Sequence, residues 1–295
     1  MKIYDCTTFY AEDMMYDLRL NILNETVNKF IVAEATYSHS GVPKKLNFNI
    51  NNYPKFKDKI IYIVIDKEPE GIKEIKKDDI NIPAIKRANS LKRIELSYNA
   101  MLKATNEASD DDLIILSDND EIPNLKSKNF LRSKKDIIVF KQLFFYYKFN
   151  LYYDLLPWFG SKSCKKKKLL SLAWLNNLKT KKYPFWRLDT LFSDLKHINL
   201  DIINDGGWHF THLMYPEQIY EKLINFGHHS EFELSGISLN NIKEKVKQKK
   251  VFYNHFSDKT KGDNWNYDYP LKKIDNKLLP EYLISNLDKY REWFD

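Results

Sequence analysis

The sequence contains little cysteine and little glycine. Its 295 residues include only two cysteines, Cys6 and Cys164, which are far apart and belong to no C-x-x-C pair. A disulfide scaffold and a thiolate zinc site are therefore excluded, and a reducing compartment is expected. The eight glycines also exclude collagen-like and glycine-rich linker architectures.

Long apolar runs are absent as well. Asp5 lies where a signal peptide needs an apolar segment, and no later stretch approaches the roughly 18 apolar residues of a membrane-spanning helix. We therefore expect no transmembrane segment and a cytoplasmic location.

Several common catalytic motifs are missing. The sequence has no G-x-x-x-x-G-K-[ST], G-x-G-x-x-G, H-E-x-x-H or G-x-S-x-G. P-loop, Rossmann, zincin and α/β-hydrolase functions are thereby excluded, and metal and diphosphate chemistry remains.

What is present indicates a globular enzyme. Apolar residues make up 43% of the chain, enough for a real core. Lys and Arg number 47 against 40 for Asp and Glu, and this net charge of +7 does not by itself indicate nucleic-acid binding. The aromatic content of 15% suits flat ligands such as bases and sugars.

Short apolar runs of strand length recur in the first half of the chain. They cover residues 30–33, 59–65, 113–116 and 136–140. A helix is predicted within residues 12–28, before the first run. These runs predict an α/β fold with a mostly parallel central sheet.

Another helix is predicted between the second and third runs, with Leu91, Ile94, Tyr98 and Met101 on its buried face. In the second half, a helix is predicted from about Pro216.

No repeat and no Gly/Ser linker divides the sequence. We therefore expect one domain over residues 1–295. Residues 1–150 would form its nucleotide- and metal-binding half, and residues 151–295 its acceptor-side half with the C-terminal helices.

The strongest chemical signal is the acidic segment Ser117–Pro123, directly after a buried strand. Ligands of open α/β sheets collect at the carboxyl ends of strands, and Asp118 and Asp120 point the same way in strand geometry. Such carboxylates can hold Mg²⁺ or Mn²⁺. A solvated acidic turn is the alternative.

A second signal is the segment Asp205–Phe210. Its glycines would let a ligand approach the backbone, Trp208 offers a face for sugar stacking, and His209 offers an imidazole ligand. The alternative is a structural histidine in the core.

Three further features have less specific patterns. Glu34 could hold a ribose or uracil edge, or belong to an ordinary turn. Glu231 could act as a base or be an exposed carboxylate at a helix end. The run Lys165–Lys168 could meet phosphates or anionic lipid head groups in a peripheral membrane contact, or form a solvated loop.

Taken together, five ordered segments resemble glycosyltransferase family 17, which includes the bisecting β-1,4-N-acetylglucosaminyltransferase. The resemblance extends along the whole chain. The segments that carry it are Ile3–Cys6 with Phe9, Phe30–Ala35 with Ser40–Lys44, Ser117–Pro123, Gly206–Phe210 and Pro280–Leu283.

The resemblance implies a GT-A-like fold, a divalent metal and inverting transfer of N-acetylglucosamine from UDP-GlcNAc to a glycan hydroxyl. It places Asp118 and Asp120 on the D-x-D motif, with Asp118 also binding the donor. A bacterial or viral member, acting in a bacterial cell or a virus-infected host cell, is expected.

The resemblance also suggests roles for the remaining candidates. Glu34 would lie near the nucleoside and Trp208 near the sugar, while His209 would contact the metal or diphosphate. Glu231 is the first choice for the general base and Asp205 the reserve.

Two other functions remain open from the sequence. A metal-dependent nucleotidyltransferase also uses paired acids after a strand. A basic, aromatic nucleic-acid-binding module is suggested by the lysine runs and the aromatic residues between 144 and 153, although the dispersed charge argues against a nucleic-acid partner.

Overall fold

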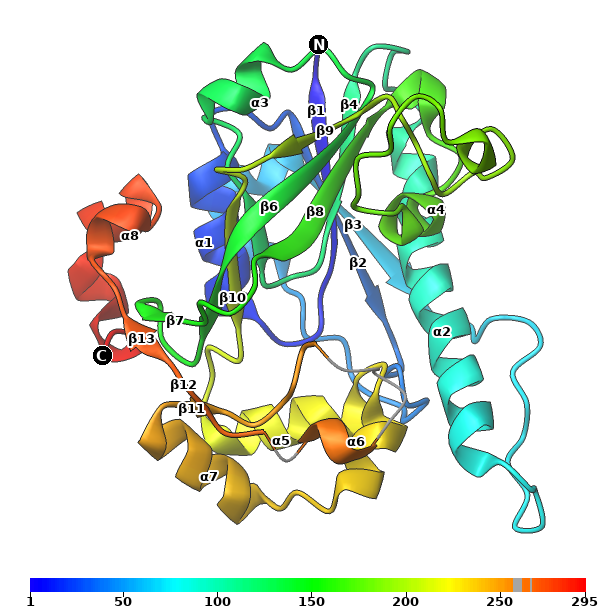
Figure 1. The fold of residues 1–295 in the computed structure, drawn as a ribbon, viewed down its shortest axis with the longest axis vertical. Coiled ribbons are helices and arrows are strands. Elements are labelled where there is room, and N and C mark those ends of the chain that lie inside the picture. The colour runs from blue at the N-terminus through cyan, green and yellow to red at the C-terminus, as the bar shows by residue number, and fades with distance from the viewer. Residues whose placement is uncertain (257–261, 266) are drawn as a thin grey trace.

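The computed structural model describes residues 1–256, 262–265 and 267–295 (Figure 1). Its strands are β1 Ile3–Thr8, β2 Lys29–Ala35, β3 Ile60–Ile65, β4 Leu113–Ser117, β5 Glu121–Pro123, β6 Ile137–Tyr146, β7 Leu151–Tyr152, β8 Trp158–Lys165, β9 Leu200–Ile203, β10 Gly207–Thr211, β11 Lys250–Val251, β12 Tyr269–Pro270 and β13 Lys272–Lys273. Its helices are α1 Asp13–Leu23, α2 Ile82–Ala100, α3 Lys128–Arg132, α4 Leu172–Asn177, α5 Pro216–Asn225, α6 His229–Ser235, α7 Leu239–Gln248 and α8 Glu281–Ser285.

A large central sheet organises these elements. Its strand order is β13-β7-β6-β8-β4-β1-β2-β3, and β5, β9 and β10 branch from this path. Strands β3, β2, β1 and β4 are mutually parallel, whereas β8 runs antiparallel between β4 and β6. The predicted α/β class with a large central sheet of GT-A-like character is confirmed.

The four predicted strands all form, as β2, β3, β4 and the first half of β6. Their apolar runs lie in the sheet with helices on both faces (Figure 1), which explains why their sequences do not alternate strictly with polar residues. The predicted helices form as α1, α2 and α5.

The sequence analysis did not predict β1, the strand between β2 and β4. Asp5 interrupts its apolar pattern, yet this residue is only 1% exposed. Arg19 of α1 binds the Asp5 carboxylate with both Nε and Nη2, at 2.7 and 2.5 Å. A buried acid is tolerated in this strand because a buried cation pairs with it.

The predicted buried face of α2 is partly wrong. Leu91 is 49% exposed, whereas the polar residues Asn89, Ser90 and Arg93 are buried. These polar side chains face the loops that follow β2 and β3, where His39 and Lys73 bind them. The helix therefore turns a polar stripe toward the candidate site.

The aromatic block between residues 144 and 153 is core rather than surface. Phe144, Phe145 and Phe149 are fully buried, and Tyr146 and Tyr147 are 2% exposed. These rings pack against one another and against Phe210. They offer no platform for stacking nucleic-acid bases, which removes the feature that suggested a nucleic-acid-binding module.

The core runs across the proposed boundary near residue 150. Tyr146 of β6 and Ile219 of α5 share one buried cluster, and β6 also pairs with β9 and β10 from the second half. No helix within the described residues is long and apolar enough to cross a membrane.

Two adjacent glycines at the start of β10 allow neighbouring backbone segments to approach closely. A Cβ on Gly207, whose φ is +121°, would lie 2.2 Å from the Ile122 carbonyl oxygen. A Cβ on Gly206 would lie 2.5 Å from the Lys141 amide nitrogen. The predicted close approach at these glycines is therefore made by the protein's own backbone and not by a ligand.

Gly207→Ala should lower the free energy of unfolding by about 3 kcal/mol or more, because it combines a disfavoured φ with a backbone overlap. Gly236→Ala is the matched control, since Gly236 also has a positive φ, +68°, but open space around it. Strain alone should cost that variant only about 1–2 kcal/mol. Urea unfolding followed by circular dichroism measures both, and equal losses would contradict the overlap.

Candidate active site

The acidic segment lies at the carboxyl ends of the parallel strands. Asp118 and Asp120 directly follow β4, the neighbour of β1 in the sheet. Asp118 is exposed, and its Oδ1 accepts a hydrogen bond of 2.7 Å from the Tyr98 hydroxyl. Asp120 is only 8% exposed. The pair thus combines one accessible carboxylate with one buried carboxylate.

Two basic side chains lie beside the carboxylate of Asp120. Lys222 Nζ lies 3.4 Å from its Oδ2, and His209 Nε2 lies 3.4 Å from its Oδ1. Burial alone would raise the pKa of Asp120, but Lys222 and then His209 outweigh burial and hold this pKa well below its usual range. Asp120 is therefore an anion at every physiological pH.

Lys222 bridges two buried acids. Its Nζ also lies 3.6 Å from Oε1 of Glu12, the residue before α1. Burial would lower the pKa of Lys222, but Asp120 and then Glu12 raise it above the ordinary value. This ammonium group is the cation that α5 brings to the acidic segment.

His209 is held by aromatic stacking. Its ring lies 4.6 Å from that of Phe144 and 4.4 Å from that of Trp158, with small interplanar angles to both. Nε2 faces Asp120, whereas Nδ1 is buried without a hydrogen-bond partner among the described residues. The ring is thus fixed with one nitrogen directed at the acidic pair.

Glu121 holds the acidic segment in place through hydrogen bonds from its side chain. Its Oε1 accepts a 2.6 Å hydrogen bond from Trp158 Nε1, and its Oε2 accepts a 3.1 Å bond from the Asp118 amide. Burial and then Asp118 raise the pKa of Glu121 to about 8. Glu121 holds Asp118 in place, and its orientation leaves it no free oxygen for a ligand.

Polar and basic side chains of α2, among them Ser90, Arg93 and Arg87, form a surface near the acids that we call the basic wall. Ser90 Oγ and Arg93 Nη1 both donate to the backbone carbonyl of His39, at 2.9 and 3.2 Å. Burial, and then the charge of Arg93, lower the pKa of His39 to about 4. Arg87 and Lys222 add to the positive charge around this imidazole. Such a concentration of cations suits an anionic ligand.

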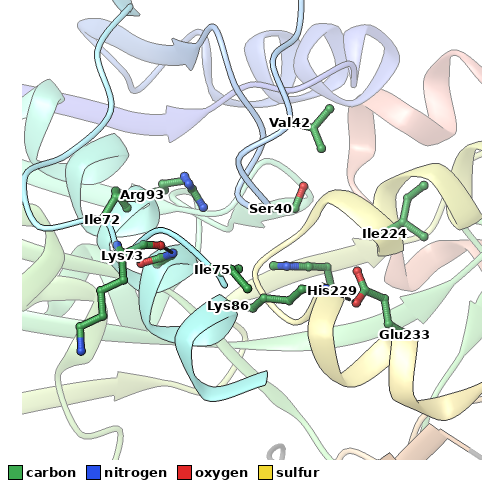
Figure 2. A pocket seen from close by; sticks show the side chains of 11 residues that line it. Ser40, Val42, Ile72, Lys73, Ile75, Lys86, Arg93, Ile224, His229 and Glu233 are labelled. Carbon is green, nitrogen blue, oxygen red and sulfur yellow. Dashed lines mark hydrogen bonds and ion pairs between the residues drawn. The ribbon is translucent and has the colours of Figure 1, made fainter. Parts of the chain in front are cut away.

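A pocket of about 340 Å³ opens on this wall (Figure 2), a volume that suits a small ligand. Arg93 lies on one side of it, and His229 lies on another beside the ion pair of Lys86 with Glu233. The loop after β2, helix α2 and helices α5 and α6 all contribute to its lining.

Glu231 lies on α6, next to this wall. Its Oε1 lies 3.2 Å from His228 Nδ1 and 3.9 Å from Arg87 Nε, and its Oε2 is buried without a hydrogen-bond partner among the described residues. Burial would raise the pKa of Glu231, but the hydrogen bond with His228, a backbone hydrogen bond and the charges of His228 and Arg87 together outweigh it, and the net effect lowers this pKa. Within the described parts of the chain, no direct ion pair or hydrogen bond joins Glu231 to Asp118 or Asp120.

Glu34 is a buried structural carboxylate. It accepts hydrogen bonds from the amides of Asn47 and Phe48, at 2.7 and 3.0 Å, from the Tyr62 hydroxyl at 2.9 Å, and from the Lys44 ammonium. Its two oxygens therefore hold the loop that follows β2. The geometry offers no free edge for the nucleoside expected there.

Trp208 and Asp205 lie apart from the acidic pair. Trp208 precedes His209 on β10 and faces the opposite side of the sheet, where its Nε1 donates to the Leu278 carbonyl at 2.7 Å. Asp205 precedes β10, and its carboxylate binds Asn129 of α3. Within the part of the chain that the structure describes, these hydrogen bonds tie the two side chains to Leu278 and Asn129 rather than to Asp118 or Asp120.

The donor atoms near Asp118 suit a divalent ion that also binds a diphosphate. The described residues contain no group of three His, Cys, Asp or Glu side chains that could enclose a metal. Two carboxylates with the remaining ligands from phosphate and water are the usual arrangement for Mg²⁺. Asp118 and Asp120 therefore fit as ligands, whereas His209 Nε2 is directed at Asp120 itself.

Comparison with protein families gives the decisive match. The model of glycosyltransferase family 17 matches residues 1–170, more than half of the chain. The chain belongs to glycosyltransferase family 17. The matched range contains the acidic segment, whereas β10 and the helices α5 and α6 lie beyond it.

Solved structures show only distant likeness. HddC from Yersinia pseudotuberculosis, complexed with GMP-PN, is 13% identical with a TM-score of 0.34, covering 75% of this chain and 97% of that chain. The Francisella tularensis 2-C-methyl-D-erythritol 4-phosphate cytidylyltransferase (IspD) is 12% identical with a TM-score of 0.28, covering 57% and 74%. Scores this low support no conclusion on function. No curated protein matches the chain.

The residues of the site that the sequence analysis missed in this family 17 chain include Glu12, Trp158 and Lys222 around the acids, and Arg87 and Arg93 on α2. A signal existed for Lys222, because it is three residues after the buried Ile219 and thus shares the inward face of α5. A lysine at such a position is rarely buried without a partner. Glu12 and Trp158 carry no comparable signal.

Lys222→Met should lower the melting temperature of the ion-free protein, because Asp120 and Glu12 then lose their cation. Mn²⁺ should stabilise this variant more than the wild type, since no ammonium group competes for Asp120. Thermal unfolding over a MnCl₂ titration measures both effects. We expect an apparent Kd for Mn²⁺ at least about tenfold lower in the variant.

Lys243→Met is the control. Lys243 of α7 forms an exposed ion pair with Glu217 of α5, the helix that also carries Lys222, and the variant removes that pair. This variant should respond to Mn²⁺ like the wild type. Equal manganese stabilisation of all three proteins would contradict the competition between Lys222 and the ion.

Proposed function

We propose that this glycosyltransferase moves N-acetylglucosamine from UDP-GlcNAc to a glycan hydroxyl, forming a β linkage with inversion at the anomeric carbon. The observation that carries the proposal is the pair Asp118 and Asp120 at the carboxyl edge of the parallel strands, in a family 17 chain. The donor sugar and the linkage rest on the family resemblance.

The charges around the site suit a nucleotide diphosphate. Lys222, Arg87 and Arg93 lie on α5 and α2, which flank the acidic segment with positive charge. In the proposed complex these groups bind diphosphate oxygens and stabilise the negative charge that develops on the leaving UDP. The pocket beside Arg93 offers space for further parts of the donor.

Mn²⁺ or Mg²⁺ is the proposed cofactor, held by Asp118 and Asp120 together with the donor diphosphate. A bound ion would neutralise charge on the leaving group. Because Asp120 is paired with Lys222 in this structure, Lys222 must release Asp120 or share it when an ion binds. His209, fixed by its stacked rings, then keeps the Asp120 carboxylate oriented.

Glu231 is the proposed general base. Its unpartnered Oε2 is the oxygen available to accept the proton of an acceptor hydroxyl, and its lowered pKa keeps it ionised at neutral pH. The acidic pair is occupied by other contacts, so the base must come from elsewhere. The Glu231 side chain is buried on α6 near Arg87 of α2, and the exclusion of water from this region would strengthen the proton transfer.

A glycan acceptor in the cytoplasm of a bacterial cell or a virus-infected host cell is proposed. Cys6 and Cys164 are both buried free thiols, which supports a reducing compartment.

Glu231→Gln should lower kcat about 10²- to 10⁴-fold, because it keeps the size of the side chain and removes its basicity. The affinity for UDP should change little, since the acidic pair is untouched. Release of UDP from UDP-GlcNAc, with and without acceptor glycans, measures turnover, and calorimetry with UDP measures binding.

Glu217→Gln is the control, because Glu217 is an exposed carboxylate on the neighbouring helix α5, pairs with Lys243 at the surface and lies outside the pocket lining. It should keep wild-type turnover. Full activity of Glu231→Gln would disprove the base assignment, and tight binding of a GDP- or CMP-sugar without any binding of UDP-sugars would disprove the donor.

A further inference from the structure

A segment between α4 and β9 exposes large apolar side chains. We call residues 183–192 the apolar loop. Its exposed residues are Phe185 at 81%, Trp186 at 66%, Leu188 at 70%, Leu191 at 72% and Phe192 at 90%. So many exposed apolar groups within ten residues mark an interaction surface, because soluble proteins usually scatter such groups singly.

The base of this segment is anchored to the folded domain. The Lys179 amide donates to the Leu195 carbonyl at 2.9 Å and so joins the two ends of the segment. Trp174 of α4 donates from Nε1 to the Asp194 carbonyl at 2.7 Å. The apolar loop therefore projects from a fixed base rather than from a free linker.

Polar contacts within and next to the apolar loop leave its apolar side chains exposed to solvent. Arg187 binds Asp189 with two hydrogen bonds of 2.6 and 2.9 Å, and Lys196 binds the same carboxylate at 2.7 Å. Phe185 and Trp186 pack edge to face with centroids 5.1 Å apart. The polar groups thus satisfy one another while the rings face solvent.

Positive charge surrounds these apolar groups. Between residues 179 and 196 the chain has five basic and two acidic side chains, a net charge of +3. The basic residues are Lys179, Lys181, Lys182, Arg187 and Lys196. Arg187 and Lys196 pair with Asp189 and Lys182 pairs with Asp201, so the charge that remains for a partner comes chiefly from the exposed Lys179 and Lys181. Exposed Trp and Phe beside Lys and Arg are typical of protein surfaces that enter the interface of an anionic bilayer.

A second copy of the chain is a poorer partner for this surface. A two-fold dimer would place the same patch against itself, so that its positive charges would face one another. An anionic lipid surface instead supplies both the missing negative charge and an apolar phase.

We propose that the apolar loop inserts into the head-group region of an anionic lipid bilayer. Phe185, Trp186 and Phe192 enter the boundary with the acyl chains, while the flanking lysines meet lipid phosphates. This inference is independent of which sugar the enzyme transfers. It gives the protein a peripheral membrane contact through a segment other than the one expected from the sequence.

The expected segment, Lys165–Lys168, is less suited to lipid. Lys165 and Lys167 pair with Asp111, Lys165 also pairs with Asp136, and Lys166 donates to the Thr105 hydroxyl. Much of the charge of this run is therefore neutralised within the protein.

The position of the apolar loop leaves the candidate active site free. Figure 1 shows the segment after α4 projecting near the N-terminal end of the sheet, whereas α5 and α6 cover the opposite edge. A bilayer that binds the apolar loop would therefore not cover α5 and α6.

Sedimentation with lipid vesicles tests the proposal on the full chain. The wild type should bind phosphatidylcholine vesicles containing about one third phosphatidylglycerol at least about tenfold more tightly than vesicles of phosphatidylcholine alone. The triple variant Phe185→Ser, Trp186→Ser and Phe192→Ser should lose at least about tenfold in binding to the anionic vesicles. Lys181→Glu with Lys182→Glu should weaken it as well.

Leu131→Ser with Phe256→Ser is the matched control, since both residues are exposed apolar groups elsewhere on the surface. This variant should bind anionic vesicles like the wild type. Unchanged binding by the triple variant would overturn the proposal. So would a wild-type dimer, detected by light scattering without lipid, that the triple variant dissociates. Neither result depends on the glycosyltransferase assay.

Discussion

The guanidinium of Arg19 ties together three parts of the fold around the acidic segment. Arg19 is fully buried on α1, binds both carboxylate oxygens of Asp5 in β1, and donates from Nη1 to the Glu121 carbonyl. Removing one partner of such a buried pair typically costs about 3–5 kcal/mol, because the other charge stays buried. The position of the carboxylates after β4 therefore depends on a helix and a strand from the start of the chain.

The site is completed by residues from the second half of the chain. The acids come from the part that matches family 17, whereas Lys222 and His209 come from α5 and β10 beyond it. Asp120 has an opposite charge within 3.4 Å before any ligand binds. A diphosphate or a metal ion that entered as proposed would have to exchange partners with Lys222, and its binding would depend on the difference in free energy between the old and new ion pairs.

The sequence predicted the elements that consist of continuous apolar runs and missed those whose burial depends on a distant partner. Continuous apolar runs made β2, β3 and β4 predictable, but Asp5 concealed β1 because its partner Arg19 is invisible in a local pattern. The acidic segment was found because three acids follow a strand. The sequence analysis assigned Trp208 and His209 to one site, but adjacent residues of a strand face opposite sides of the sheet, so the two side chains cannot both face it. The role of Lys222 could not be predicted without knowing how α5 packs against the sheet.

The central claim is that Asp118 and Asp120 form the diphosphate site of a sugar transfer. Phosphorus NMR tests it in two mixtures with MnCl₂, one holding UDP-GlcNAc and a panel of glycan acceptors, the other UTP and GlcNAc 1-phosphate. The account predicts that the wild type releases UDP in the first mixture and that Asp120→Asn does not. Asp111→Asn is the control and should still release UDP, because Asp111 is an exposed acid before the start of β4, at the end of the strand away from Asp118 and Asp120. Pyrophosphate from the second mixture, without UDP from the first, would contradict it and indicate nucleotidyl transfer.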